Sequence, residues 1–127
     1  MIHGVGTDLC EIARIGRALE NDRFLLRIYT PAEQERLSGL GPERRIECAA
    51  GLFAAKEAIA KALGTGFTGF GFADIEILPD EKGCPRAALH GGAADVLQKK
   101  TVHVSISHDG GMALAFAVIE SKGGSAE

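Results

Sequence analysis

Two charged residues that could act on a phosphorylated substrate fall within one predicted helix. Glu57 and Lys61 lie four residues apart in the stretch GLFAAKEAIAKALGTG, so a helix places both on one stripe of its surface. Glu57 before Lys61 is also the favourable order for an exposed ion pair, which stabilises a helix by roughly 0.2–0.5 kcal/mol. The spacing alone therefore allows either a solvated helix face or a carboxylate and a cation that reach one cleft.

The residues around this pair favour the cleft. The helix has a separate apolar face and many small residues that suit close packing: Leu52, Ala54, Ala55, Ala58, Ile59, Ala60 and Ala62. Close packing would partly enclose the stripe that carries Glu57 and Lys61. With Asp8 across from them, the three side chains would form a metal-and-cation clamp for a diphosphate.

Asp8 follows a run of small and β-branched residues, which predicts a strand over residues 2–8 and then a helix over 11–19. One interpretation makes Asp8 the N-cap of a helix that begins near Cys10, and it is the simpler one on sequence alone. The other makes Asp8 a ligand of Mg²⁺, because a carboxylate at a strand end is well placed beside a phosphate.

Capping signals define the predicted helices. Thr30, Pro31 and Glu33 give a helix start with a capping box. Pro42 begins a long helix for which Gly64 is a natural stop. Shorter helices are expected at 24–28 and 93–99.

Alternating residues define the predicted strands. Residues 102–107 and 112–119 form an antiparallel hairpin, and further short strands are expected at 74–78 and 85–89. We therefore predict one α+β domain, an antiparallel sheet packed against a long central helix and shorter helices. The domain covers residues 1–120, and residues 121–127 form a flexible tail.

The composition limits the classes of protein. The 127 residues are 46% apolar and 24% charged, as expected for one globular domain with a hydrophobic core. The net charge of −3 gives no general attraction to nucleic acid or to an anionic membrane. Three widely spaced cysteines without a CxxC pair, and the lack of a signal-like or membrane-length apolar run, favour a cytoplasmic protein.

Residues 64–69 read GTGFTG, which fits the letters of a dinucleotide-binding loop. Such a loop must follow a strand and open a helix, so that phosphate meets the helix N-terminus. Here the pattern follows a helix, and we reject this interpretation. A flexible connector is the simpler explanation, although the glycines could let a backbone approach a phosphate.

Several segments, taken in order, closely resemble the holo-acyl-carrier-protein synthases, which are short bacterial 4′-phosphopantetheinyl transferases. The segments are GVGTDLCEIARI, FAAKEAIAKALGTG, DIEIL followed by DEKGCPRAAL, and VSISHDGGMALAFAVIE. The resemblance extends from Ile2 to about Glu120. The combination of GxD near the N-terminus with a later FxxKExxxK is specific to this family.

The resemblance implies a reaction. The 4′-phosphopantetheine arm of coenzyme A would pass to a serine hydroxyl of apo-acyl carrier protein, leaving adenosine 3′,5′-bisphosphate. Asp8 and Glu57 match the Mg²⁺ ligands, and Lys61 matches a lysine that neutralises charge on the leaving group. The serine must lose its proton, and either Glu57 or a metal-bound water could accept it.

The resemblance also assigns residues to coenzyme A. Gly64 and Gly66 match a loop whose backbone donors approach the phosphates, next to Lys61. Pro85 and His108 match positions near the nucleotide end, although a lone histidine beside a turn is more often structural. The family further implies a homotrimer, with coenzyme A bound in clefts between neighbouring subunits.

Arginines are concentrated in the first part of the chain, where seven of the eight precede residue 46. The pattern alone indicates either an ordinary solvated surface or a docking surface for an acidic partner. Acyl carrier proteins are strongly acidic, and the resemblance makes Arg14, Arg23 and Phe24 the docking positions. It does not distinguish a carrier of fatty acid biosynthesis from one of polyketide synthesis.

One position departs from the family, whose members commonly read GRFAAKE. Leu52 replaces that arginine, which predicts weaker binding of the cofactor phosphates or of the carrier rather than lost chemistry. Leu52 leaves open a non-catalytic homologue that binds coenzyme A or a carrier protein. A third possibility, outside the family, is a small oligomeric scaffold with a solvated helix, in which Asp8 and Glu57 would lie far apart.

Overall fold

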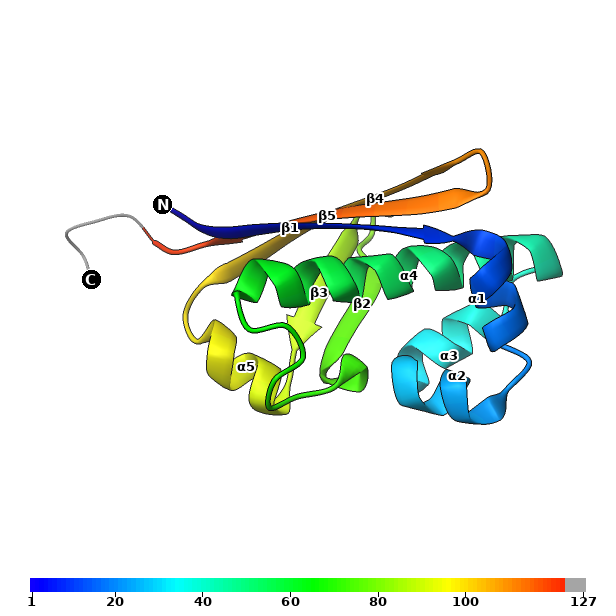
Figure 1. The fold of residues 1–127 in the computed structure, drawn as a ribbon, viewed down its shortest axis with the longest axis horizontal. Helices are drawn as coiled ribbons and strands as arrows, with labels where there is room; N and C mark the ends of the chain where they lie inside the picture. Colours follow the sequence, from blue (N-terminus) through cyan, green and yellow to red (C-terminus); the bar gives the residue numbers. More distant parts are fainter. Residues whose placement is uncertain (123–127) are drawn as a thin grey trace.

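A long helix packed against one face of a three-stranded sheet forms the centre of the computed structural model, which describes residues 1–122 (Figure 1). The sheet is antiparallel with the strand order β1-β5-β4, and β2 pairs with β3 in a separate two-stranded sheet. The helices are α1 (Ile12–Ala18), α2 (Asp22–Ile28), α3 (Pro31–Ser38), α4 (Pro42–Leu63), the 3-10 turn η1 (Phe72–Asp74) and α5 (Gly91–Leu97). The strands are β1 (Ile2–Glu11), β2 (Ile75–Pro79), β3 (Pro85–Leu89), β4 (Thr101–Asp109) and β5 (Met112–Glu120).

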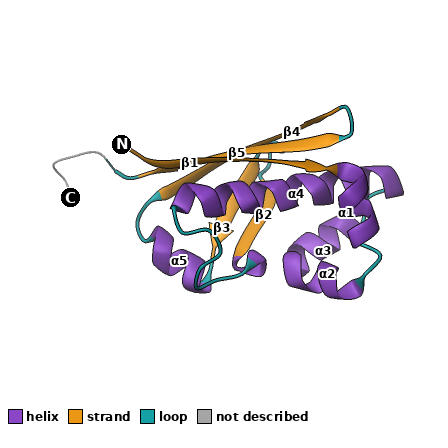
Figure 2. Ribbon diagram, in the orientation of Figure 1, coloured by secondary structure: helices purple, strands orange, loops and turns teal. Residues whose placement is uncertain are grey.

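The helices cover only one face of the three-stranded sheet (Figure 2). Helices α1, α2 and α3 gather at one end of α4, and α5 lies at the other end (Figure 1). On the opposite face of the sheet, large apolar side chains of β1 and β5 remain exposed: Val5, Leu9, Leu114 and Phe116. This face of the sheet is uncovered by the described residues. It carries an exposed apolar patch on β1 and β5 beside polar side chains of β4.

The central helix α4 forms as its sequence predicts. Pro42 stands in its first turn, and Gly64 ends it in the left-handed conformation at φ 86°. Its apolar face is buried against β1, β4 and β5, and it includes Leu52, Ala55 and Ile59. Within residues 1–122, no helix is both long and apolar enough to span a membrane.

Two glycines let β1 lie directly on α4. A Cβ built on Gly4 would overlap the carbonyl oxygen of Ala62, and one built on Gly6 would overlap the carbonyl oxygen of Ala58. Side chains alternate along a strand, so Asp8 lies on the same face as these glycines, toward the helix. The close approach of strand and helix therefore sets the position of the Asp8 carboxylate.

Strand β1 is longer than the sequence predicts, and the prediction that it ends near Asp8 is wrong. Asp8 pairs with Ala115 in the interior of the strand, because β5 continues to pair with β1 as far as Glu11. The N-cap of α1 is Glu11, with extended backbone and no capping side chain. The interpretation of Asp8 as a helix cap is therefore wrong as well.

Most other elements lie close to their predicted ranges. The capping box of Thr30 and Glu33 is present, and Asn21 accepts a hydrogen bond from the Arg23 amide at the start of α2. The last helix begins two residues earlier than predicted, at Gly91. Of the predicted tail, residues 123–127 lie outside the described residues, while Ser121 exchanges backbone hydrogen bonds with Met1.

Candidate active site

The structure brings Asp8, Glu57 and Lys61 together from β1 and α4, and we call them the carboxylate–lysine cluster. The Lys61 ammonium donates to the carbonyl oxygen of Thr7 at 2.8 Å and lies 3.3 Å from Asp8 Oδ1. The Lys61 side chain is 54% exposed and that of Asp8 is 17% exposed. The cluster is therefore accessible from solvent, and its lysine is oriented by the strand.

The two carboxylates of the cluster destabilise each other when both are charged. Burial raises the pKa of the Glu57 carboxyl above its ordinary value, and the neighbouring charge of Asp8 raises it further. Lys61 and Arg14 act on this pKa in the opposite direction without cancelling the shift. An added cation at this position would relieve the repulsion.

The donor set of the cluster fits Mg²⁺. Mg²⁺ prefers oxygen ligands and is commonly held by one or two carboxylates, with waters and substrate phosphates completing its shell. Asp8 and Glu57 provide those two carboxylates. Among residues 1–122 no three His, Cys, Asp or Glu side chains lie close enough to hold a metal by themselves. The cluster therefore suits a cation that shares its ligands with a bound phosphate.

Pro85 and His108 lie in a different part of the chain, where they line a cleft of about 590 Å³. We call it the Pro85–His108 cleft. Leu52 forms part of its wall and is only 3% exposed. The sequence did not point to Arg36 and Arg44, which also line this cleft. Two arginines from α3 and α4 and one glutamate, Glu47, therefore line the cleft, which has an excess of positive charge without an arginine at position 52.

The other residues predicted to bind coenzyme A lie at the C-terminal end of α4. Gly64 and Gly66 have φ values of 86° and 60°, and a Cβ built on either would meet no atom within 4 Å. Leu52 and Gly64 are twelve residues apart, which corresponds to about 18 Å along the helix axis. The structure thus places Gly64 and Gly66 beside Lys61, but within one chain it does not unite them with the Pro85–His108 cleft.

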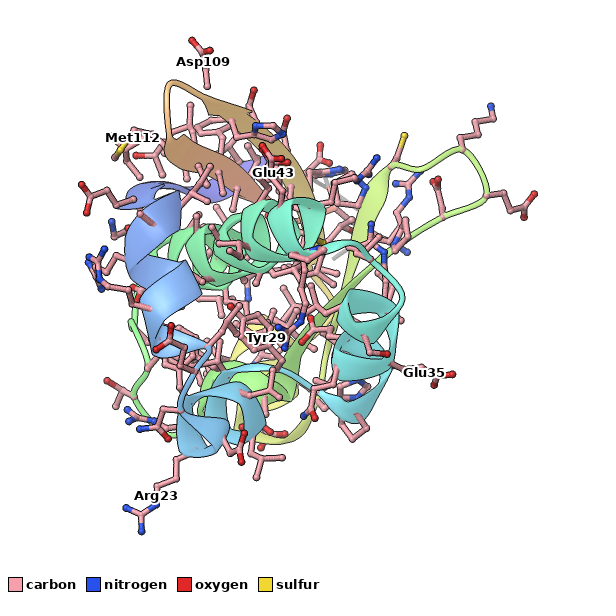
Figure 3. All side chains as sticks on the ribbon, turned by 90° about the vertical axis from the view of Figure 1, so that its right-hand side faces the viewer. Arg23, Tyr29, Glu35, Glu43, Asp109 and Met112 are labelled. Carbon is pink, nitrogen blue, oxygen red and sulfur yellow. The ribbon has the colours of Figure 1, made fainter. Side chains whose placement is uncertain are left out.

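The predicted docking residues lie on α1 and α2. Arg14 is exposed and close enough to the cluster for its charge to lower the pKa of Glu57. Arg23 extends from α2 into solvent (Figure 3). Phe24 is half-buried, and its ring lies 6.1 Å from that of Phe53, which is one helical turn before Glu57. Phe24 therefore packs close to the turn of α4 that precedes Glu57.

A buried ion pair between α3 and α4 was not predicted from the sequence. Lys56 and Glu33 are both fully buried, with 2.6 Å between the ammonium and the carboxylate. Helical periodicity could have indicated Lys56, because it lies four residues after Leu52 and three before Ile59, on the apolar face. Glu33 gave no such signal, since a capping box alone explains its position.

Comparison with known proteins identifies the family. The model of the 4′-phosphopantetheinyl transferase superfamily matches residues 4–117. The chain belongs to this superfamily. A holo-(acyl-carrier-protein) synthase of Solidesulfovibrio magneticus is 50% identical over 126 residues, covering 94% of this chain and 99% of that protein. One of Clostridium perfringens is 42% identical over 130 residues, covering 96% of each.

Solved structures of the same family share the fold. A holo-(acyl-carrier-protein) synthase from Bacillus anthracis, in complex with coenzyme A (3′,5′-ADP), superposes with a TM-score of 0.84 at 41% identity, covering 96% of this chain and 99% of that one. The enzyme from Neisseria meningitidis gives a TM-score of 0.87 at 35% identity, covering 95% and 100%. The resemblance stated from the motifs and the predicted α+β class are therefore confirmed.

Proposed function

We propose that this chain is a holo-acyl-carrier-protein synthase. It transfers the 4′-phosphopantetheine arm of coenzyme A to a serine of apo-acyl carrier protein and releases adenosine 3′,5′-bisphosphate. The observation that carries this proposal is the convergence of Asp8, Glu57 and Lys61 from two separate elements in a chain of this superfamily. The same convergence argues against a scaffold with a solvated helix, because that would leave Asp8 and Glu57 apart.

The residues of the cluster have distinct roles in the transfer. The serine oxygen forms a bond to the β-phosphorus of coenzyme A as the bond from that phosphorus to the oxygen of the leaving bisphosphate breaks. Lys61 has three N–H donors, and Thr7 and Asp8 occupy two of them. The third is left for a phosphate oxygen, where the charge stabilises the leaving group.

Glu57 is our candidate for the group that takes the serine proton. A carboxylate of the cluster can accept this proton either directly or through a metal-bound water. Asp8 and Glu57 together would hold Mg²⁺, whose charge would polarise the diphosphate. Glu57 therefore has two proposed roles, as a metal ligand and as the proton acceptor. Its removal would eliminate both.

We further propose that the enzyme is a homotrimer with its sites shared between subunits. Two observations support this. The residues assigned to coenzyme A fall in two groups. Lys61, Gly64 and Gly66 lie at the C-terminal end of α4, whereas Pro85 and His108 line a cleft whose wall includes Leu52, about 18 Å before Gly64 along the helix axis. The apolar face of the three-stranded sheet, with Leu9 opposite Leu114 on the neighbouring strand, offers a surface for subunit contact.

The partner is an acidic acyl carrier protein that docks on α1 and α2. Arg14 and Arg23 would attract its charge, and Phe24 would contact its apolar side chains. We place the reaction in the cytoplasm, in agreement with the three free cysteines. The carrier is one of fatty acid biosynthesis or of polyketide synthesis.

Mass spectrometry tests the proposal directly. The protein is incubated with apo-acyl carrier protein, coenzyme A and Mg²⁺, and the carrier is expected to gain one phosphopantetheine. A carrier with its acceptor serine replaced by alanine is the matched control and should gain nothing. If no carrier from fatty acid or polyketide synthesis gains mass while coenzyme A still binds, the chain is a non-catalytic homologue.

A further inference from the structure

The buried pair of Lys56 and Glu33 joins four segments of the chain. The Lys56 ammonium donates to the carbonyl oxygen of Ile28 at 2.6 Å, to Glu33 at 2.6 Å and to the carbonyl oxygen of Phe72 at 3.3 Å. The Glu33 carboxylate accepts from the amides of Thr30 at 2.8 Å and Ile77 at 2.7 Å. One ion pair therefore fixes the end of α2, the start of α3, η1 and β2 to the central helix.

Every polar atom of this pair is used. An ammonium group has three N–H donors, and that of Lys56 donates to three oxygen atoms, one for each donor. The ammonium also lies 5.6 Å from the centre of the Tyr29 ring, which is buried within the core near α2 (Figure 3). Apolar residues of similar size would commonly fill such a space at no loss of stability, so the directional contacts are the distinctive contribution of the pair.

The fixed segments are those that carry binding residues. Ile28 is the last residue of α2, the helix that bears Arg23 and Phe24. Phe72 follows the glycine-rich loop that starts at Gly64, and its ring stacks on that of Phe53 with 5.4 Å between ring centres. The docking helix and the far end of the phosphate loop thus meet at a single ammonium group.

Lys56 is also the direct neighbour of Glu57 in the chain. The two side chains leave α4 in different directions. Lys56 points into the core and is fully buried, whereas Glu57 is half-buried beside Asp8. Any shift of α2 or of the loop relative to Lys56 is therefore a shift relative to Glu57. The positions of α2 and of the 64–72 loop relative to the cluster therefore depend on Lys56.

We propose that Lys56 is a positioning residue, which holds the carrier-docking helix α2 and the end of the 64–72 loop in register with Glu57 and Lys61. The proposal rests on the proposed function, since it concerns how the carrier and coenzyme A are aligned for transfer. Lys56 does not touch the reacting atoms, so its removal acts on the binding of both substrates rather than on the chemical step alone.

The test uses the double variant Lys56→Met/Glu33→Gln, which removes both charges and keeps similar side-chain volumes. The Michaelis constants for carrier and for coenzyme A are measured separately, and that for the carrier is expected to rise about tenfold or more. Ile59→Ala is the control, because Ile59 is a fully buried residue of the same helix that makes no contact in the pair's hydrogen-bond network. It should lower the melting temperature while leaving both Michaelis constants close to those of the wild type.

A second measurement does not depend on activity. Amide hydrogen exchange of the double variant should become faster in residues 22–28 and 64–72, with little change in β1 and β5. If the double variant and Ile59→Ala change kinetics and exchange alike, the role of Lys56 is structural and the proposal is wrong. If the wild type transfers nothing, the proposed function fails, and faster exchange confined to the two segments would still support the positioning role.

Discussion

The backbone of Gly6 lies directly against the carbonyl oxygen of Ala58, with no room between them for a side chain. Gly6 belongs to β1 and Ala58 to α4, so this contact brings strand and helix together two residues before Asp8 and one residue after Glu57. The proposed role of the carboxylate–lysine cluster requires such a contact, because Asp8 and Glu57 could share one metal ion only if strand and helix stay close.

Gly6→Ala should therefore damage stability and turnover together. The added methyl group cannot fit without moving backbone, and overpacking of this kind typically costs about 1–3 kcal/mol. We expect turnover to fall by about tenfold or more, because Asp8 moves with the strand. Denaturant unfolding and steady-state kinetics measure the two effects. Gly39→Ala is the control, since its φ of −83° suits alanine and its nearest atom is at an ordinary 3.5 Å.

Glu57→Gln should abolish transfer while leaving the fold intact. The amide keeps the shape of the side chain but loses the charge that holds a cation and the capacity to accept a proton. We expect turnover to fall by about 10²-fold or more. Circular dichroism checks the fold, and Glu35→Gln, a change of an exposed glutamate on α3, should behave as the wild type. If Glu57→Gln had the turnover of the wild type, Glu57 would have no role in the reaction.

The same variant should be more stable than the wild type when metal is absent. The pKa of Glu57 is raised in the folded protein, so the folded state holds this proton more tightly than the unfolded chain does. Its ionisation therefore lowers stability as the pH rises above the ordinary value of 4.5. In EDTA the melting temperature of Glu57→Gln should exceed that of the wild type at pH 7.5, and the difference should vanish near pH 4.

Magnesium should reverse this order of stability. Mg²⁺ is expected to raise the melting temperature of the wild type, because it binds the folded state, and to have little effect on Glu57→Gln. Equal melting temperatures of the two proteins at every pH, with and without Mg²⁺, would contradict the raised pKa of Glu57, which burial and the neighbouring charge of Asp8 cause.

Leu52→Arg should strengthen the binding of coenzyme A. Leu52 lines the Pro85–His108 cleft, so a longer side chain there could extend its guanidinium toward the mouth of the cleft. A hydrogen bond to a charged group contributes about 1.5–3 kcal/mol, which corresponds to roughly a tenfold or greater fall in the Michaelis constant for coenzyme A. Leu52→Met is the matched control for side-chain length. Unchanged Michaelis constants for both coenzyme A and carrier would show that position 52 does not limit binding.

Phe116→Lys should dissociate the assembly. Phe116 is 44% exposed on the apolar face of the three-stranded sheet, and a charge buried in a subunit interface is costly. Sedimentation analysis should find a trimer for the wild type and a monomer with little activity for the variant. Ala88→Lys adds the same charge at an exposed position of β3 and should remain trimeric. A monomeric wild type would refute the proposed homotrimer.

Local signals sufficed for most of the fold. The helix α4 follows from Pro42, its apolar spacing and Gly64, and the β4–β5 hairpin follows from alternation around the glycine turn. The end of β1 could not be predicted, because Leu9 and Cys10 extend the strand only through their pairing with β5. Pairing between segments a hundred residues apart has no local signal.

The motifs could predict which residues form the candidate cluster, but they could not predict how the whole site is arranged. The motifs identified Asp8, Glu57 and Lys61, and the structure unites them. The separation of Gly64 from His108 within one chain could not be read from spacing, because it depends on which strands and helices lie side by side. The burial of Lys56 could not be predicted for another reason. A sequence does not distinguish a buried lysine from a surface lysine unless the residues that pair with it are known.

The separation of the two binding regions along α4 has a genetic consequence. If sites are shared between subunits, a subunit that lacks Glu57 still offers an intact cleft to a neighbour that lacks His108. Two inactive alleles expressed in one cell would then restore function, at roughly a quarter of all sites when equal amounts mix at random. The gene for this small protein would show complementation between alleles, which an enzyme with a complete site in each chain cannot show.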